Sequence, residues 1–157
     1  MDRLIDIEDG WATPPTSSPR LNELYRYWME CRGKRSRPSR GDIRPADLVP
    51  ILRHVFLVDV GGNEDFRFRL AGSHFTENTR LPMAGSSIAT VFPALFCQEV
   101  RDAWGRCARQ SVPMLGRGRF WIPQRDFLNW EGVVLPLSEP NQPVNMLFGA
   151  IEFRARL

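Results

Sequence analysis

The chain has 157 residues, the length of one domain, and a net charge of +3. Its hydrophobic fraction of 43% and charged fraction of 25% are those of an ordinary globular protein, and a chain this long can form a core without a disulfide or a metal ion. No window approaches the ~18 consecutive apolar residues of a membrane span. The acidic first residues lack the basic and apolar parts of a signal peptide, so we expect a cytoplasmic protein without a membrane partner.

The cysteines show neither redox nor zinc-binding spacing. Cys31, Cys97 and Cys107 lie far apart in the sequence, and their odd number argues against a disulfide framework. We therefore expect reduced thiols that pack as small apolar side chains, and no metal site.

Basic residues are concentrated in residues 32–40. The segment contains Arg32, Lys34, Arg35, Arg37 and Arg40. Such a cluster can bind phosphate or nucleic acid, but here no aromatic residues alternate with the charges to stack on bases. A solvated basic connection is the favoured interpretation. Nucleic-acid or phosphate binding through this segment is the alternative.

The N-terminal region divides into an arm and a helix. Residues 1–18 combine acids with prolines and serines, which predicts a flexible arm. Ser18 and Pro19 are typical of a helix start and Gly33 of a helix end, so a helix is expected over 19–33. Its apolar positions follow the i, i+3, i+4, i+7 pattern of an amphipathic helix. They are Leu21, Leu24, Tyr25 and Trp28. This stripe must cover the domain or pair with a second copy, and we predict that it forms a dimer interface.

A short helix and a β-hairpin are expected next. Residues 34–44 read as irregular, and 45–53 as a short helix. Residues 55–60 are β-branched and apolar, and a Gly-Gly-Asn turn follows them. In residues 65–71, Phe66, Phe68 and Leu70 alternate with two arginines, which predicts a half-buried strand. Residues 54–71 are therefore predicted to form a hairpin.

The remainder is predicted to be two helices and three strands. Ser73 caps a short helix over 74–80, residues 81–91 read as a loop, and Pro93 opens a helix to about Gln110. Strands are expected at about 112–121, 127–137 and 144–154. Short turns between consecutive strands indicate antiparallel pairing and an α+β fold. We expect one domain over 19–157, with its core in residues 45–154.

Three motifs in a fixed order resemble a known family. The first combines Trp28, Arg32-Gly33, Pro38-Ser39-Arg40, Asp42-Ile43 and Pro45, the second is residues 66–73, and the third is Leu135-Pro136-Leu137. Over roughly residues 25–152 they resemble a bacterial family of short, free-standing PAS-like proteins. The resemblance implies a five-stranded antiparallel sheet with helices inserted between strands 2 and 3, preceded here by the N-terminal amphipathic helix. It implies sensing or protein interaction rather than catalysis. Residues 78–85 depart from the family pattern and keep only its final glycine.

Haem and flavin are common PAS cofactors, and the residues argue against both. Haem requires an axial ligand, and the histidines are His54, expected near the surface, and His74, on the short helix. His74 is more typical of a hydrogen-bonded structural group. The flavin-adduct type of PAS domain carries an Asn-Cys-Arg motif, and residues 73–85 contain no cysteine. We expect no cofactor.

The ligand site is predicted from the groups that point inward from the second strand and the adjoining helices. They are Phe68, Leu70, His74, Phe75, Asn78 and Trp104. His74 and Asn78 share one helical face and could orient a polar ligand in an apolar cavity. The alternative is that the aromatic residues simply fill the core.

Three residues of the motifs are interpreted as structural. Asp42 is expected to cap the helix that starts at Pro45, and Arg40 to tie the N-terminal segment to the sheet. An anion-binding fork at Arg40 is the alternative. Gly72 is expected to supply a backbone angle that other residues resist.

The predicted function is a non-catalytic sensor or interaction module. It would act through homodimerisation or an unidentified signalling partner protein, with a small-molecule ligand in its core. An NTF2-like small-molecule enzyme is the first alternative. Such enzymes use paired acids, histidines or tyrosines in a cavity, and the inner strand faces here carry few acids. A nucleic-acid binder is the second alternative.

Overall fold

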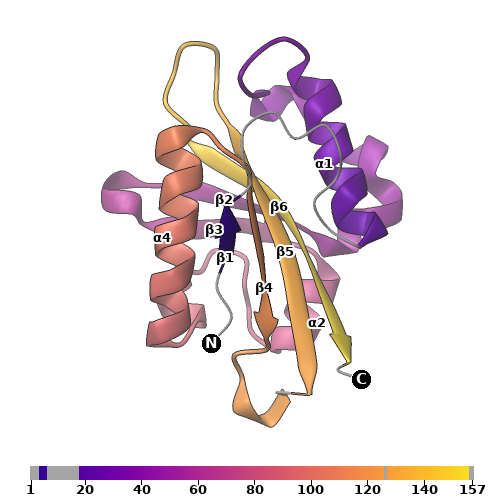
Figure 1. The fold of residues 1–157 in the computed structure, drawn as a ribbon, viewed down its shortest axis with the longest axis vertical. Helices are drawn as coiled ribbons and strands as arrows, with labels where there is room; N and C mark the ends of the chain where they lie inside the picture. Colours follow the sequence, from indigo (N-terminus) through magenta and orange to yellow (C-terminus); the bar gives the residue numbers. More distant parts are fainter. Residues whose placement is uncertain (1–3, 7–17, 126, 156–157) are drawn as a thin grey trace.

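The computed structural model describes residues 4–6, 18–125 and 127–155, which form one antiparallel sheet with helices on both faces (Figure 1). The strand order is β1-β4-β5-β6-β2-β3. The strands are β1 Leu4–Asp6, β2 Val55–Val60, β3 Phe66–Ala71, β4 Met114–Arg119, β5 Leu128–Leu137 and β6 Met146–Ala155. The five predicted strands and their antiparallel pairing are confirmed.

The strand β1 is an addition to the predicted sheet. It pairs antiparallel with β4, with Leu4 opposite Gly116. Residues 4–6 therefore depart from the flexible arm predicted for 1–18. Apart from these residues and Ser18, that arm lies outside the described residues.

The helices occupy the predicted places. They are α1 Pro19–Arg32, α2 Ser73–Thr79, α3 Ile88–Val91 and α4 Ala94–Gln110, with 3₁₀ helices η1 Arg40–Asp42, η2 Pro45–His54, η3 Gly62–Glu64 and η4 Pro123–Arg125. Helices α2 to α4 lie between β3 and β4, as expected. Helix α3 replaces part of the loop predicted for 81–91, and the Ser87 side chain caps it. Within the described residues, no helix has the length and apolarity needed to cross a bilayer.

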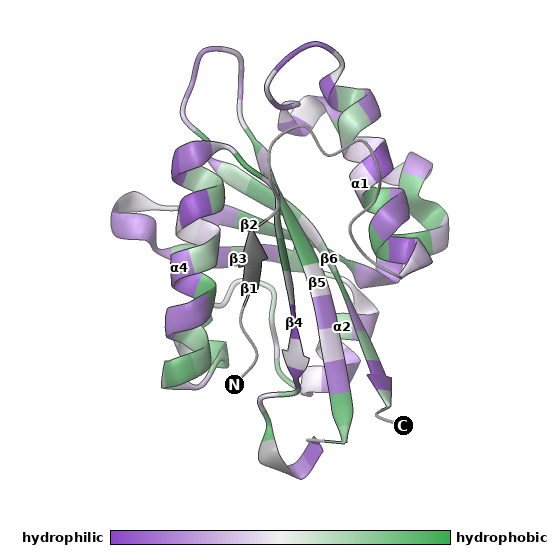
Figure 2. Cartoon of the chain, in the orientation of Figure 1, coloured by the Kyte–Doolittle hydropathy of each residue, from purple (hydrophilic) through white to green (hydrophobic). Residues whose placement is uncertain are grey.

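Two apolar cores lie on opposite faces of the sheet. Successive residues of a strand face opposite sides, so Val134 joins the core under α2, α3 and α4, while Val133 joins the core under α1 and η2. Helices α1 and α4 flank the sheet in Figure 1, and Figure 2 shows both alternating between hydrophobic and hydrophilic residues. The sheet is therefore buried on both faces, which explains the apolar runs in β2 and β5.

The stripe of α1 packs on the sheet of its own chain. Leu21, Leu24, Tyr25 and Trp28 are 0%, 0%, 4% and 1% exposed. Trp28 Nε1 also donates a hydrogen bond to the Pro136 carbonyl at 3.0 Å. Of the two arrangements that the stripe allows, the structure adopts packing on the domain. These side chains have no free area for a second copy, which corrects their assignment to a dimer interface.

A β-bulge reverses the expected orientation of Leu70. Leu57 lies opposite Leu70, but Val58 lies opposite Phe68, so Arg69 is an extra residue in β3. An extra residue shifts the alternation of side chains between the two faces. Phe66 and Phe68 are buried as expected, whereas Leu70 is 37% exposed. The prediction that Leu70 points into the ligand site is therefore wrong.

Candidate functional site

An aromatic cluster fills the space between the sheet and helices α2 to α4. The Trp104 ring lies 5.8, 5.8 and 5.9 Å from the rings of Phe56, Phe66 and Phe68. Phe75 lies 5.5 Å from Phe68, edge to face. The structure thus brings together three of the predicted ligand residues, Phe68, Phe75 and Trp104. Such aromatic pairs add stabilisation beyond the area they bury.

A small apolar cavity remains within this cluster. Its volume is about 40 Å³. It is lined by Phe56, Phe75, Phe92, Phe96, Val100, Trp104, Met114, Gly116, Trp121, Trp130, Gly132, Val133, Val134 and Ile151. Of the predicted ligand residues, only Phe75 and Trp104 line it. An apolar cavity of about 150 Å³ holds one benzene molecule, so this one is too small for a ring unless its walls move.

His54 and His74 form a pair beside the cluster, with ring centres 4.0 Å apart, and His74 is half-buried. His54 is 4% exposed, which corrects the expectation that it lies near the surface. Its Nδ1 lies 3.1 Å from the Ile151 carbonyl, and His74 Nε2 accepts a hydrogen bond from the Phe153 amide at 3.1 Å. Because a carbonyl only accepts and an amide only donates, Nδ1 of His54 is protonated and Nε2 of His74 is not.

Desolvation disfavours the charged form of both rings. Desolvation is the main cause that lowers the pKa of His54. Desolvation, followed by the proximity of His54, lowers the pKa of His74 to about 4. The pair ties η2 and α2 to β6. Neither histidine lines the cavity, so the predicted polar contact to a core ligand is absent from it.

The Asn78 side chain contacts its own helix α2 and does not line the cavity. Its Nδ2 donates to the His74 carbonyl at 2.7 Å and lies 3.5 Å from His74 Nδ1. The predicted i, i+4 proximity of these two side chains is therefore present. It stabilises α2 locally.

A larger groove, missed from the sequence, lies between the first turn of α4 and strands β4 and β5. Its volume is about 530 Å³, and Leu95, 71% exposed, lies on it. Phe96 stacks on Trp121 here, with ring centres 4.4 Å apart and planes at 13°. These rings come from α4 and from the β4–β5 connection. Their proximity depends on tertiary packing, which cannot be predicted from the local sequence pattern.

The basic segment is tied to the domain mainly by Arg37. Its Nε donates to Ser138 Oγ at 2.6 Å, Nη1 to Ser111 Oγ at 3.1 Å, and Nη2 to the Gln142 carbonyl at 2.6 Å. Ser138 follows β5, Ser111 follows α4, and Gln142 lies in the β5–β6 turn. Arg37 therefore has the tying role that was predicted for Arg40. Among the described residues, Arg40 donates through Nη1 to the nearby Ile43 carbonyl at 3.0 Å and to no distant segment.

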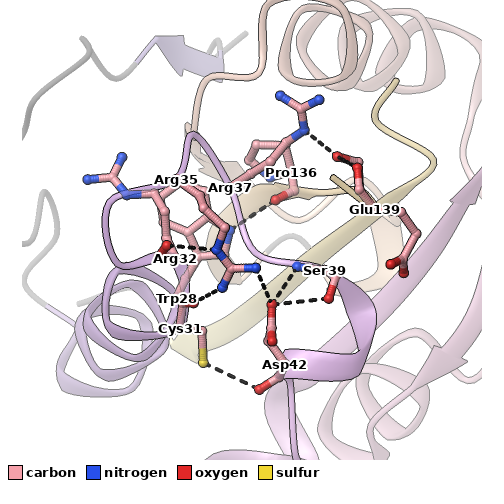
Figure 3. A network of polar contacts seen from close by, with 10 residues as sticks. Trp28, Cys31, Arg32, Arg35, Arg37, Ser39, Asp42, Pro136 and Glu139 are labelled. Carbon is pink, nitrogen blue, oxygen red and sulfur yellow. Dashed lines mark hydrogen bonds and ion pairs between the residues drawn. The ribbon is translucent and has the colours of Figure 1, made fainter. Parts of the chain in front are cut away.

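Asp42 organises the turn after the basic segment (Figure 3). Its carboxylate accepts from the Ser39 amide at 2.9 Å and from Ser39 Oγ at 3.1 Å, and it pairs with Arg35 at 3.0 Å. The Ser39 hydrogen bonds are the main cause that lowers the pKa of Asp42. Asp42 thus closes η1, and the expectation that it caps η2 is wrong, since Arg44 occupies that cap position without a side-chain hydrogen bond.

The other cations of the segment also contact the chain. Arg35 donates to the Cys31 and Arg32 carbonyls at 2.6 and 3.2 Å. These hydrogen bonds give partners to two carbonyls at the C-terminal end of α1 that the helix itself leaves free. The Arg32 guanidinium lies 5.3 Å from the centre of the Trp28 ring. Most of the positive charge in 32–40 is therefore engaged in structural contacts.

Gly72 is required by a close approach rather than by its backbone angle. Its φ of −65° and ψ of 161° are open to any residue, which corrects the expectation of an unusual angle. A Cβ here would lie 2.2 Å from the Arg53 carbonyl oxygen and 2.7 Å from that of Leu52. Gly72 therefore allows the end of β3 to contact the end of η2.

Within the described parts of the chain, no group of three or more His, Cys, Asp or Glu side chains could hold a metal ion. Cys107 is buried, and burial raises the pKa of its thiol. A raised pKa disfavours the thiolate that nucleophilic chemistry needs.

The sheet order, with three helices between the second and third core strands and an aromatic cavity beneath them, defines a PAS-type domain. A family model described as "PAS domain" matches residues 16–152, and the chain belongs to this family. No curated protein matches it. A solved structure described as "Structure of an RNA-binding Light-Oxygen-Voltage Receptor" is similar, with a TM-score of 0.50 and 12% identity over 97% of this chain. The chain spans 38% of that protein, and at this identity the likeness shows the fold alone.

Proposed function

We propose that this PAS domain is a non-catalytic sensor and interaction module that binds a small apolar ligand in or beside its core. The observation that supports this most is the cavity lining, which consists entirely of apolar and aromatic residues. General acid–base catalysis needs a titratable group within reach of the reacting atoms. A wall of this composition favours binding over chemistry. It also weakens the alternative of an NTF2-like enzyme, because the only histidine pair lies outside the cavity.

The signal would be transmitted through a second copy of the chain. Since the α1 stripe is buried, contact must use another surface. Val49 is 67% and Leu52 39% exposed, and they lie three residues apart on η2, hence on one side of a 3₁₀ helix. Leu70, 37% exposed, lies near the end of β3. Gly72, two residues later, lies close to the Leu52 and Arg53 carbonyls at the end of η2. Neighbouring exposed apolar side chains are typical of interaction surfaces.

Nucleic-acid or phosphate binding through 32–40 is the weaker alternative. Arg35, Arg37 and Arg40 donate to carbonyl or hydroxyl groups of their own chain. Such contacts would have to be exchanged for phosphate. A steep loss of binding to an RNA or DNA oligonucleotide with added salt would support this alternative.

Native mass spectrometry of freshly purified protein tests the proposal, because it reports oligomer mass and any retained ligand together. We expect a dimer for the unmodified chain and a monomer for Val49→Asp. Phe127→Asp is the matched control, because Phe127 is similarly exposed, at 55% against 67%, but lies in the β4–β5 connection. A monomer that retains no ligand, or a dimer that Val49→Asp leaves intact, would contradict the proposed route of signalling.

A further inference from the structure

We propose that the groove beside α4 binds a neutral, planar aromatic ligand that carries a hydrogen-bond acceptor, and that this ligand enters by opening the stacked pair Phe96 and Trp121. The inference rests on the proposed ligand-sensing function and adds a place and a ligand class to it. Three observations support it: the groove and the cavity share a wall, the Trp121 indole N–H in that wall is buried without a partner, and the charges that line the groove are opposite in sign.

The groove and the cavity are separated by three aromatic side chains. Phe96, Trp121 and Trp130 line both spaces. Phe96 stacks on Trp121 at 4.4 Å and meets Trp130 edge to face at 5.5 Å. Phe96 is only partly buried and follows the exposed Leu95 on the first turn of α4. A wall of this kind opens by rotating one phenyl ring, and opening would join about 530 Å³ of groove to about 40 Å³ of cavity.

The ligand class follows from the stacking geometry. The planes of Phe96 and Trp121 lie at 13°, so the indole already holds a flat ring against one face. A flat aromatic ligand can replace the Phe96 ring there, whereas a puckered aliphatic ring cannot match this contact. The cavity alone is too small for such a ring, so the ligand must occupy the groove side of the wall.

The acceptor follows from an unpaired donor. Trp121 Nε1 is shielded from solvent and has no hydrogen-bond partner among the described residues. A buried N–H without a partner loses its hydration and gains nothing in return, and indole N–H groups in native proteins usually find an acceptor. A ligand that opens the wall and accepts a hydrogen bond from Nε1 would satisfy this donor.

The charges of the groove favour a neutral ligand. Glu99 and Arg119 both line it, and they are opposite in sign. Their fields offset each other, so the groove offers no net attraction to an ion. Selectivity must then come from shape and from the indole donor.

Two probes of the same shape test the inference. Quinoline is planar and carries an acceptor nitrogen, whereas naphthalene is planar and carries none. We expect quinoline to bind about fivefold more tightly than naphthalene, which is the effect of one neutral hydrogen bond. Quinoline should also move the Trp121 indole N–H signal downfield in a ¹⁵N-correlated NMR spectrum, a measurement that needs no variant.

Two variants distinguish the contribution of the Trp121 N–H donor from the cost of opening the wall. Trp121→Phe keeps a flat ring without the N–H, and it should reduce quinoline affinity to that of naphthalene. Phe96→Ala should tighten both probes, because the wall no longer has to open. Lys34→Ala, at an exposed position after α1 that lines neither space, is the control and should leave both affinities unchanged. Folding of each variant is checked from the dispersion of its spectrum.

The outcomes distinguish this inference from the proposed function. Equal affinity for the two probes, or quinoline binding that Trp121→Phe leaves unchanged, would overturn the groove site while ligand sensing stands. Absence of binding to both the unmodified chain and Phe96→Ala would also overturn it. The proposed function is judged separately, by the oligomer and retained ligand in native mass spectrometry.

Discussion

The rings of His54 and His74 lie 4.0 Å apart, and each contacts the backbone of β6 through one nitrogen. Two imidazoles this close cannot both be charged without strong repulsion. The hydrogen bond from the Phe153 amide requires His74 Nε2 to be unprotonated. The packing of α2 on β6 therefore depends on a neutral His74.

Protein stability should fall as the pH is lowered from about 6.5 to about 4. His74 has a pKa of about 4 in the folded chain against 6.5 for a free histidine, so the unfolded chain binds more protons in this interval. The stabilisation by neutral His74 is complete above 6.5 and is lost progressively as the pH falls to about 4. One pKa unit corresponds to 1.36 kcal/mol, so the loss is about 3 kcal/mol at most. Urea unfolding at pH 7, 6 and 5 measures it.

The control is His74→Phe. It leaves the Phe153 amide unpaired and should lower stability at pH 7, yet flatten the dependence on pH. A variant with the same pH slope as the unmodified chain would exclude His74 as the titrating group. Measurements at pH 5 and above avoid Glu152. Burial raises the pKa of this carboxyl, but contacts with Ser18, Arg154 and Arg20 outweigh it and hold the pKa below its usual value.

Arg37→Ala should destabilise the fold by about 2–3 kcal/mol. The guanidinium makes three hydrogen bonds to segments far apart in the chain, and hydrogen bonds from a charged donor contribute about 1.5–3 kcal/mol. Arg37→Lys should recover little, because an ammonium cannot reproduce the fork. Lys34→Ala is the matched control, since Lys34 is exposed on the same segment, and its change should stay within about 0.5 kcal/mol. Equal effects at both positions in urea unfolding would contradict the tying role of Arg37.

Gly72→Ala should cost about 1–3 kcal/mol through overpacking. The added Cβ would lie 2.2 Å from a carbonyl oxygen, and both partners are backbone, so η2 and β3 must separate. Gly62→Ala is the control, because no atom lies within 4 Å of its added Cβ. Thermal unfolding compares the two. If both variants melt like the unmodified chain, the contact between η2 and β3 is looser than described.

The elements were predictable because their signals are local. The i, i+3, i+4, i+7 pattern predicted helix α1, and alternation predicted β3 as far as Phe68. The orientation of Leu70 was missed because the bulge at Arg69 is set by pairing with β2, where Leu57 and Val58 bracket the extra residue. No pattern within residues 65–71 reports it.

The site was only partly predictable for the same reason. Phe75 and Trp104 follow from helix periodicity, and both line the cavity. The Phe96–Trp121 stack and the burial of His54 depend on which distant segments meet. Arg37 was grouped with the other basic residues because the sequence shows its charge and not its partners.

Trp104→Ala decides how tightly the aromatic core is packed. The indole is 7% exposed and stacks on Phe56 at 21°, so truncation removes a large buried surface and leaves a hole. The expected loss is about 3–5 kcal/mol, because the existing cavity of about 40 Å³ is too small to have removed many of its neighbours. The new space should reach the size that holds benzene, so benzene should raise the melting temperature of the variant more than that of the unmodified chain. Leu95→Ala, at a position 71% exposed, is the control and should be nearly neutral. A loss below about 1 kcal/mol without a benzene effect would mean that the helices collapse onto the sheet when the indole is removed, and that the core is deformable rather than tightly packed.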